Sequence, residues 1–424
     1  MRGMASLLAV AFTTLLLAAP AAAATGAQFQ ATIDAILAEP YQPDYVPLGY
    51  DSAFGAAVVP NTAPVQDYTT GSIPGSPDAP AWPPIFKPVL LQSLDGAPLP
   101  GQLALHPGKH PGIVVVHGFN THGNLSVIRW AAMLAANGYN VLSADLRDFS
   151  TAYSAGAGYP NWLQTFGWKE AEDVVAMGRF LAAQPGVTSV GVVGFSLGAE
   201  ATVLALALEG RLPRSKAVFT AGLQFSGPAD QNTQIYSTAE PPGCQTPLCT
   251  YPATDALVTL VVPPYSYTDV CQVLDDAAVY YQTTSQAILA RASAYRAQPY
   301  VRVPLLGIYA ADDPLVAAFQ VTMMAGYQSG ELQRTLELRR GAHAYFYDRW
   351  WQQRAILLYF KAMLPGAARD TWIGTQPTVT RAPSGAPASE QLVDFGSPTR
   401  SYADAQAAPF VCDTSQPPPA YAAP

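Results

Sequence analysis

Charged residues are scarce in this sequence of 424 residues. Asp, Glu, Lys and Arg together make up 12% of it, well below the share of about 25% that is usual in soluble domains. The formal net charge is −8, and no block of Lys or Arg occurs. Binding to the backbone of a nucleic acid needs clustered cations. We therefore expect no nucleic-acid partner.

Long apolar runs are also rare. After residue 25, no segment has the length and apolarity of a membrane-spanning helix, which needs about 20 residues. The start of the chain differs, because Arg2 precedes an apolar run over residues 5–19 and a stretch of small residues. This order predicts a signal peptide over residues 1–25, cleaved near Ala23 or Ala24, with a transmembrane anchor as the weaker alternative. We expect a secreted or periplasmic protein with no stable membrane span.

Cysteine is limited to four residues, which are Cys244, Cys249, Cys271 and Cys412. An even number in an exported chain predicts two disulfides. Three pairings are possible, and we favour Cys244–Cys249 with Cys271–Cys412 because the first two lie close in sequence. A zinc site is the alternative, but the sequence offers no CxxC pair with a nearby histidine. We expect no metal and no organic cofactor.

Proline, alanine and small polar residues dominate both ends of the mature chain. They mark residues 26–86 as an irregular N-terminal arm and residues 373–424 as a C-terminal tail. Between these ends, strand-like and helix-like segments alternate. The predicted strands are residues 89–94, 99–105, 113–116, 141–144, 189–193, 217–221, 303–309 and 335–338. The predicted helices are residues 127–137, 169–183, 197–208 and 347–363. This alternation predicts an α/β fold, with a mostly parallel sheet and helices on both faces.

The strongest chemical signal is the motif G-x-S-x-G at residues 194–198, with Ser196 at its centre. The motif lies between the predicted strand 189–193 and the predicted helix 197–208. In this strand–turn–helix setting a serine hydroxyl stands exposed as a nucleophile, and the glycines let strand and helix approach closely. An ordinary serine in a glycine-containing turn is the alternative.

A nucleophilic serine needs a general base, and the base needs an orienting carboxylate. His343 is the only histidine after Ser196, and it follows the last predicted strand. Asp312 and Asp313 follow the preceding strand, which gives the chain order serine, acid, histidine. We favour Asp313 because it stands directly before Pro-Leu-Val, and Asp312 remains the alternative, with a role in capping the next helix.

An acyl-transfer site also needs two N–H groups that face the developing oxyanion. The backbone N–H of Leu197, directly after the nucleophile, is one candidate. The backbone N–H of Phe119, after the strand at residues 113–116, is the second candidate. We interpret the nearby His117 as a structural hydrogen-bonding residue and not as a second base.

These segments together resemble the α/β-hydrolase superfamily, and in particular its serine esterases and lipases. The resemblance covers about residues 87–364 and implies an α/β-hydrolase sheet over residues 87–226 and 303–372. Two departures leave the subfamily open. Residues 148–150 read Asp-Phe-Ser where many relatives have Gly-x-Gly, and Ala199 replaces a common second glycine.

Residues 227–302 separate two predicted strands, at the position where the resemblance places a cap or lid. Tyrosines are frequent in this insertion, at positions 236, 251, 265, 267, 280 and 281. They predict an aromatic-lined cap over the pocket, and a disulfide-braced structural excursion is the alternative. Trp162, Phe166 and Trp168 are further candidates for the pocket wall, although we expect core packing for at least two of them.

The combined expectation is a secreted serine hydrolase that cleaves a carboxylic ester through an acyl-enzyme on Ser196. A small-molecule or lipid-like ester, apolar or aromatic, fits the absence of a basic cluster. A serine peptidase or an acyltransferase with the same three residues is an alternative. A catalytically inactive binding protein on the same fold is a further alternative.

Overall fold

A computed structural model describes the main body of the chain. The described residues are 24–41, 82–118, 123–147, 164–231, 270–311, 313, 316, 318–328, 330–339, 341, 343–344, 349–364, 366 and 392–394. The predicted signal peptide, residues 148–163 and three of the four cysteines lie outside them, and the side chain of Cys271 is not described either. The signal peptide and the disulfide pairing therefore stay predictions. Among the described helices, none is long and apolar enough to cross a bilayer.

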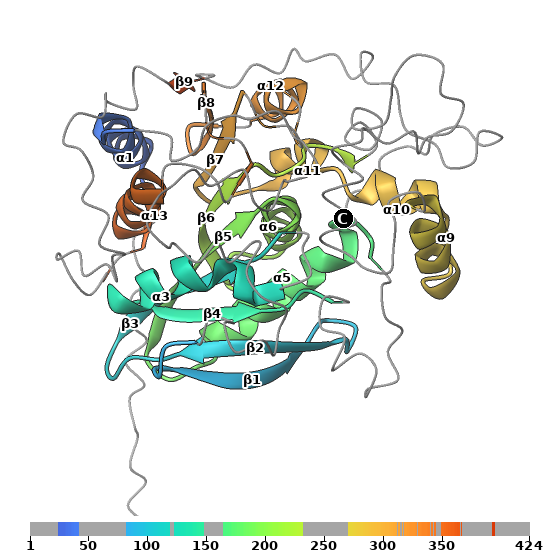
Figure 1. The fold of residues 1–424 in the computed structure, drawn as a ribbon, viewed down its shortest axis with the longest axis horizontal. Coiled ribbons are helices and arrows are strands. Elements are labelled where there is room, and N and C mark those ends of the chain that lie inside the picture. The colour runs from blue at the N-terminus through green and yellow to red at the C-terminus, as the bar shows by residue number, and fades with distance from the viewer. Residues whose placement is uncertain are drawn as a thin grey trace, which may run out of the picture.

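One nine-stranded sheet forms the centre of the molecule, in the order β1-β2-β4-β3-β5-β6-β7-β8-β9 (Figure 1). The strands are β1 Phe86–Gln92, β2 Pro98–Ala104, β3 His110–Val116, β4 Asn140–Ala144, β5 Val187–Phe195, β6 Phe219–Phe225, β7 Leu305–Ala310, β8 Gln333–Leu338 and β9 Leu392–Asp394. From β4 to β8 all neighbours are parallel. The β1–β2 hairpin and β9 add antiparallel strands at the two edges. The predicted fold class, a mostly parallel α/β sheet, is confirmed.

Helices cover both faces of this sheet. They are α1 Gly26–Ala38, α3 Ile128–Ala136, α5 Trp168–Ala182, α6 Leu197–Gly210, α9 Val270–Tyr280, α10 Ser285–Arg291, α11 Ala294–Ala297, α12 Ala318–Gly326 and α13 Arg349–Met363, with the 3₁₀ turns η1 Gly123–Val127 and η3 Gln298–Tyr300. Helices α1, α3 and α13 share one hydrophobic core, and α5, α6 and α12 share the other. Strand β3 supplies Ile113 and Val115 to the first core and Val114 and Val116 to the second, because successive side chains of a strand point to opposite faces.

Helix α1 was not predicted, since the composition of residues 26–86 suggested an irregular arm. The side chains of Phe29, Ile33 and Ile36 recur at helical spacing and are fully buried. They join the core that contains α13, where Trp351 Nε1 donates a hydrogen bond to the carbonyl oxygen of Ile36 at 3.3 Å. The segment Gly26–Ala38 is thus folded onto the domain.

Strand β6 lies further along the chain than the predicted segment 217–221. Gly222 and Gln224 interrupt the apolar pattern after residue 221, and the predicted strand ended there. In the structure, Gly222 lies against Leu206 of α6, where a β-carbon would overlap. The Gln224 amide donates to the hydroxyl of Tyr309 on the neighbouring strand β7, at 2.7 Å. Tertiary partners therefore extend the strand through both residues.

Candidate active site

Ser196 lies in the sharp turn between β5 and α6, at the carboxyl edge of the parallel strands. Its backbone has φ 53° and ψ −124°, which is a left-handed conformation that is strained for a residue with a side chain. The backbone N–H of Ser196 donates to the carbonyl oxygen of Phe225 at 2.9 Å. The surrounding sheet thus holds the turn in place and keeps the hydroxyl at its tip.

Two glycines make this turn possible. A β-carbon on Gly194 would overlap with the carbonyl oxygen of Gly198, and a β-carbon on Gly198 would overlap with the carbonyl oxygen of His117 at the end of β3. Helix α6 can therefore start directly against the sheet only if both positions lack side chains. This confirms the role predicted for the two glycines of the motif.

The structure brings together the three residues predicted to act as nucleophile, base and acid. His343 Nε2 lies 2.8 Å from Ser196 Oγ. His343 Nδ1 lies 2.9 Å and 3.0 Å from the two carboxylate oxygens of Asp313. The ring therefore connects hydroxyl and carboxylate through its two nitrogens, as a general base oriented by an acid requires. Asp312 lies outside the described residues.

Local hydrogen bonds hold the loops that carry Asp313 and His343. Asp313 Oδ1 also accepts from the backbone N–H of Val316 at 2.9 Å. Next to His343, the backbone N–H of Ala344 donates to Ser226 Oγ at 3.2 Å, and its carbonyl oxygen accepts from Gln352 Nε2 at 2.7 Å. Ser226, directly after β6, was not among the predicted site residues. It fixes the histidine loop to the strand that also supports the serine turn.

Burial strengthens the electrostatics of this chain of hydrogen bonds. The side chains of His343 and Asp313 are 6% and 1% exposed. In a poorly solvated environment, a charge on the imidazole interacts more strongly with the carboxylate than it would in water. The arrangement can therefore accept a proton from the serine hydroxyl and stabilise the resulting imidazolium.

The candidate oxyanion donors are described in part. Leu197 is the first residue of α6, and the first N–H groups of a helix have no partner within the helix and carry partial positive charge. Its N–H is thus available to an anion beside Ser196. Phe119 lies outside the described residues, so its role stays a prediction.

His117 has the structural role that we expected. Its Nε2 accepts from the backbone N–H of Leu146 at 2.9 Å, and its Nδ1 lies 2.7 Å from the carbonyl oxygen of Gly118. Burial lowers the pKa of His117 to about 4, because the charged ring would lose its hydration. The neutral ring thus links the ends of β3 and β4 below the predicted oxyanion loop.

Asp145 was not predicted from the sequence, although it follows β4 directly. Its Oδ1 accepts from the backbone N–H of Asn124 at 2.6 Å, at the start of η1. Burial raises the pKa of Asp145 to about 7, and the hydrogen bond from Asn124 opposes this rise. Asp145 therefore secures one end of the loop that contains Phe119.

Glu200 is a second charged residue that sequence reasoning missed, although it interrupts an otherwise apolar helix. It is fully buried, one turn after Ser196, and accepts a hydrogen bond from Gln231 Nε2 at the start of the insertion. Burial raises the pKa of Glu200 well above its usual value, and the hydrogen bond from Gln231 opposes this. Through this hydrogen bond, Glu200 links the helix that follows Ser196 to the start of the predicted insertion.

The aromatic candidates for a pocket wall differ in position. Phe166 is buried, Trp168 is half-buried at the start of α5, and Trp162 lies outside the described residues. Within the described ranges, no three His, Cys, Asp or Glu side chains come together as metal ligands would.

Comparison with known proteins identifies the fold family. The model of the alpha/beta hydrolase family matches residues 113–355, which is more than half of the chain. The chain belongs to the α/β-hydrolase family. The matched range contains Ser196, Asp313 and His343, and the family assignment supports a hydrolase. No curated protein matches the chain.

Several solved structures of hydrolases are similar to this α/β hydrolase. An esterase from Pyrococcus furiosus has 17% identity and a TM-score of 0.45, covering 66% of this chain and 96% of the esterase. A dienelactone hydrolase from Anabaena variabilis has 16% identity and a TM-score of 0.39, covering 64% and 94%. An acylaminoacyl peptidase from Pyrococcus horikoshii has 18% identity and a TM-score of 0.44, covering 66% and 42%. The family assignment rests on the matched model and not on these neighbours.

Proposed function

We propose that this α/β hydrolase is a secreted serine hydrolase that cleaves carboxylic esters. The observation that carries the proposal is the continuous hydrogen-bonded chain from Ser196 Oγ through His343 to Asp313, with contacts of 2.8 Å and 2.9 Å. A serine hydroxyl with a base at this distance is the arrangement that activates an otherwise weak nucleophile. Asp313 is the acid of the proposal, because it makes the contact to the imidazole.

Acylation begins when Ser196 Oγ attacks the carbonyl carbon of the ester and His343 Nε2 takes the hydroxyl proton. The carbonyl oxygen becomes an oxyanion, which accepts hydrogen bonds from the N–H groups of Leu197 and Phe119. The intermediate then collapses, the bond to the alcohol oxygen breaks, and His343 gives its proton to the leaving alcohol. The acyl group remains on Ser196 as an ester.

Deacylation repeats these steps with water. His343 removes a proton from a water molecule, whose oxygen attacks the acyl carbonyl carbon. When the second intermediate collapses, the bond to Ser196 Oγ breaks and the proton on His343 returns to that oxygen. The products are a carboxylic acid and the free enzyme, and Asp313 stabilises the imidazolium in both halves of the reaction.

Export is part of the proposal. Helix α1 starts at Gly26, and the hydroxyl of its N-cap residue Thr25 accepts from the backbone N–H of Gln28 at 3.2 Å. Cleavage near Ala23 or Ala24 would leave the helix and its cap intact. A signal peptide that is cleaved near Ala23 or Ala24 is thus compatible with the folded part of the chain.

Hydrolysis of short p-nitrophenyl esters tests the proposal. We expect Ser196→Ala to lose at least about a thousandfold in kcat, because it removes the nucleophile. Ser189→Ala is a matched control, since Ser189 lies on the same strand β5 and its hydroxyl has no hydrogen-bond partner in the described structure. Equal rates for Ser196→Ala and Ser189→Ala would contradict the proposal.

A further inference from the structure

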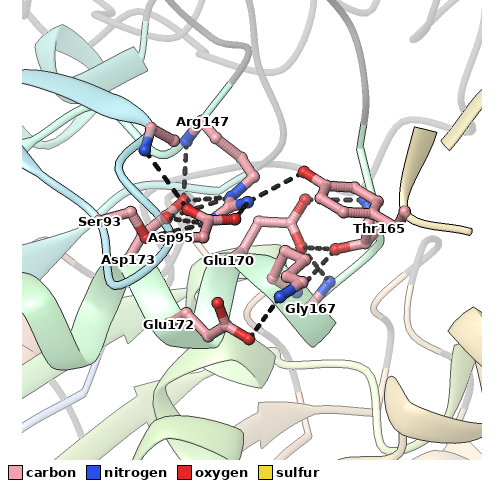
Figure 2. A network of polar contacts seen from close by, with 11 residues as sticks. Ser93, Asp95, Arg147, Thr165, Gly167, Glu170, Glu172 and Asp173 are labelled. Atoms are coloured by element: carbon pink, nitrogen blue, oxygen red, sulfur yellow. Dashed lines mark hydrogen bonds and ion pairs between the residues drawn. The ribbon is translucent and has the colours of Figure 1, made fainter. Parts of the chain in front are cut away.

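A buried polar cluster surrounds Arg147, which follows β4 at the carboxyl edge of the sheet (Figure 2). We call Arg147, Ser93, Asp95 and Asp173 the Arg147 cluster. Arg147 Nη2 donates to Asp173 Oδ1 at 2.6 Å and to Ser93 Oγ at 2.8 Å, and Nη1 donates to Asp95 Oδ2 at 2.7 Å. The cluster joins the β1–β2 turn, the end of β4 and helix α5.

The electrostatics of the Arg147 cluster make it a rigid attachment point. The side chains of Arg147 and Asp173 are fully buried. Burial alone would raise the pKa of Asp95, but the hydrogen bond and the charge of Arg147 hold it below its usual value. The ion pairs and hydrogen bonds within the cluster replace the hydration that each charged group loses on burial. Separating the members would therefore leave a buried charge without a partner, at a large cost in free energy.

A residue of the predicted cap binds directly to this cluster. Arg147 Nη1 donates to the hydroxyl of Tyr281 at 2.9 Å. Tyr281 directly follows α9, and its backbone N–H donates to the carbonyl oxygen of Ala277 in that helix at 2.8 Å. The hydroxyl thus connects the end of a cap helix to a cation that is fixed by the sheet and α5.

Trp168 provides a second attachment for the same part of the cap. Its ring meets the ring of Tyr281 edge-on, with centroids 5.6 Å apart. The guanidinium of Arg291, at the end of α10, lies 4.3 Å from the centroid of the Trp168 ring, which is a favourable cation–π distance. Helices α9 and α10 pack on each other and lie to one side of the molecule (Figure 1).

Packing of neighbouring residues connects this attachment to the helix that follows Ser196. Gly167, directly before Trp168, packs against Glu200, because a β-carbon on Gly167 would lie 3.3 Å from Glu200 Cγ and Cδ. Glu200 belongs to the first turn of α6, which starts directly after Ser196. Trp168 therefore lies directly after a residue that packs on the first turn of the helix that Ser196 precedes.

We propose that Tyr281 is a positioning residue that determines acyl specificity by fixing helices α9 and α10 to the Arg147 cluster. In the fixed position, the cap supplies an apolar wall for the acyl chain of the ester. Without the Tyr281 hydroxyl, the cap opens more often and this wall is lost. A short acyl group does not reach the wall, so the loss of the Tyr281 hydroxyl does not change the hydrolysis of its ester. This specificity role rests on the proposed ester hydrolysis at Ser196.

The test compares Tyr281→Phe with Tyr280→Phe, a matched control at the neighbouring, 44% exposed tyrosine. Hydrogen exchange of the peptides that cover α9 and α10 reports the attachment without any need for activity. We expect exchange to become about tenfold faster in Tyr281→Phe, because a hydrogen bond to a charged group is lost, and to stay unchanged in Tyr280→Phe. Equal exchange in the two variants would overturn the attachment.

Kinetics on two esters test the specificity role. For Tyr281→Phe, we expect KM for p-nitrophenyl decanoate to rise about tenfold, while kcat and KM for p-nitrophenyl acetate stay at the wild-type values. Faster exchange without a change in KM for decanoate would overturn the specificity role. A failure of the proposed function would look different, because Ser196→Ala would then match the wild type while the exchange difference would persist.

Discussion

At the scale of the residue, the orientation of one imidazole ring decides the chemistry. Ser196 and His343, the proposed nucleophile and base, could be predicted from the sequence, because the motif at residues 194–198 and the single downstream histidine leave few choices. The acid could only be narrowed to two neighbours, since Asp312 and Asp313 share the same loop. The structure favours Asp313, which lies 2.9 Å from His343 Nδ1. This distance cannot be derived from the sequence.

Substitution of the acid tests this selection. Asp313→Asn keeps the size of the side chain but removes the charge and favours the wrong tautomer of His343. We expect kcat for p-nitrophenyl acetate to fall by about ten thousandfold. Asp312→Asn is the matched control and should stay within about threefold of wild type. A larger loss in Asp312→Asn than in Asp313→Asn would show that the other aspartate is the acid.

A second prediction concerns His117, whose pKa is lowered to about 4 in the folded protein. Below about pH 6.5, the imidazole of His117 binds a proton in the unfolded chain but stays neutral in the folded chain. The free energy of unfolding therefore falls as the pH drops from about 6.5 towards 4. His117→Gln removes this titration while leaving every other group in place.

Urea unfolding at two pH values measures this effect. Between pH 7.5 and pH 5, we expect the wild type to lose about 2 kcal/mol more than His117→Gln. The comparison of the two proteins cancels the contributions of Asp145 and the other titrating groups. An equal loss in both proteins would mean that the pKa of His117 is not lowered in the folded protein.

At the scale of the element, the sequence predicted the regular α/β segments and missed those that depend on tertiary partners. Residues 113–116 of β3 and 190–193 of β5 are continuous apolar runs, which is typical of burial on both faces. Helix α1 was hidden by the surrounding proline- and alanine-rich composition, although Phe29, Ile33 and Ile36 carry helical spacing. The Arg147 cluster was not predicted, because its members are far apart in the sequence and belong to no motif.

The N-cap residue of α1, Thr25, leads to a prediction about the site of signal-peptide cleavage. If the signal peptide is removed before Thr25, the N-terminal turn of α1 keeps its capping hydroxyl, which contributes about 1 kcal/mol to helix stability. We expect N-terminal sequencing of the exported protein to identify Ala24 or Thr25 as the first residue. A first residue within α1, or an uncleaved Met1, would contradict this account.

At the scale of the whole molecule, one sheet collects loops from distant parts of the chain at its carboxyl edge. Ser196 follows β5, Asp313 follows β7 and His343 follows β8, and the right-handed parallel arrangement brings these strand ends to one edge. The Arg147 cluster occupies the same edge and binds the cap through Tyr281. The three residues proposed for catalysis and the attachment of Tyr281 are therefore built on one edge of the same sheet.

The most direct test of the central claim is covalent capture of the nucleophile. A fluorophosphonate probe forms a stable bond with a serine oxygen only where a base and oxyanion donors activate it. Mass spectrometry of the labelled, folded protein should place the probe on Ser196, with no labelling of Ser196→Ala or of unfolded wild type. Absence of the probe from Ser196 in the folded wild type would contradict the account.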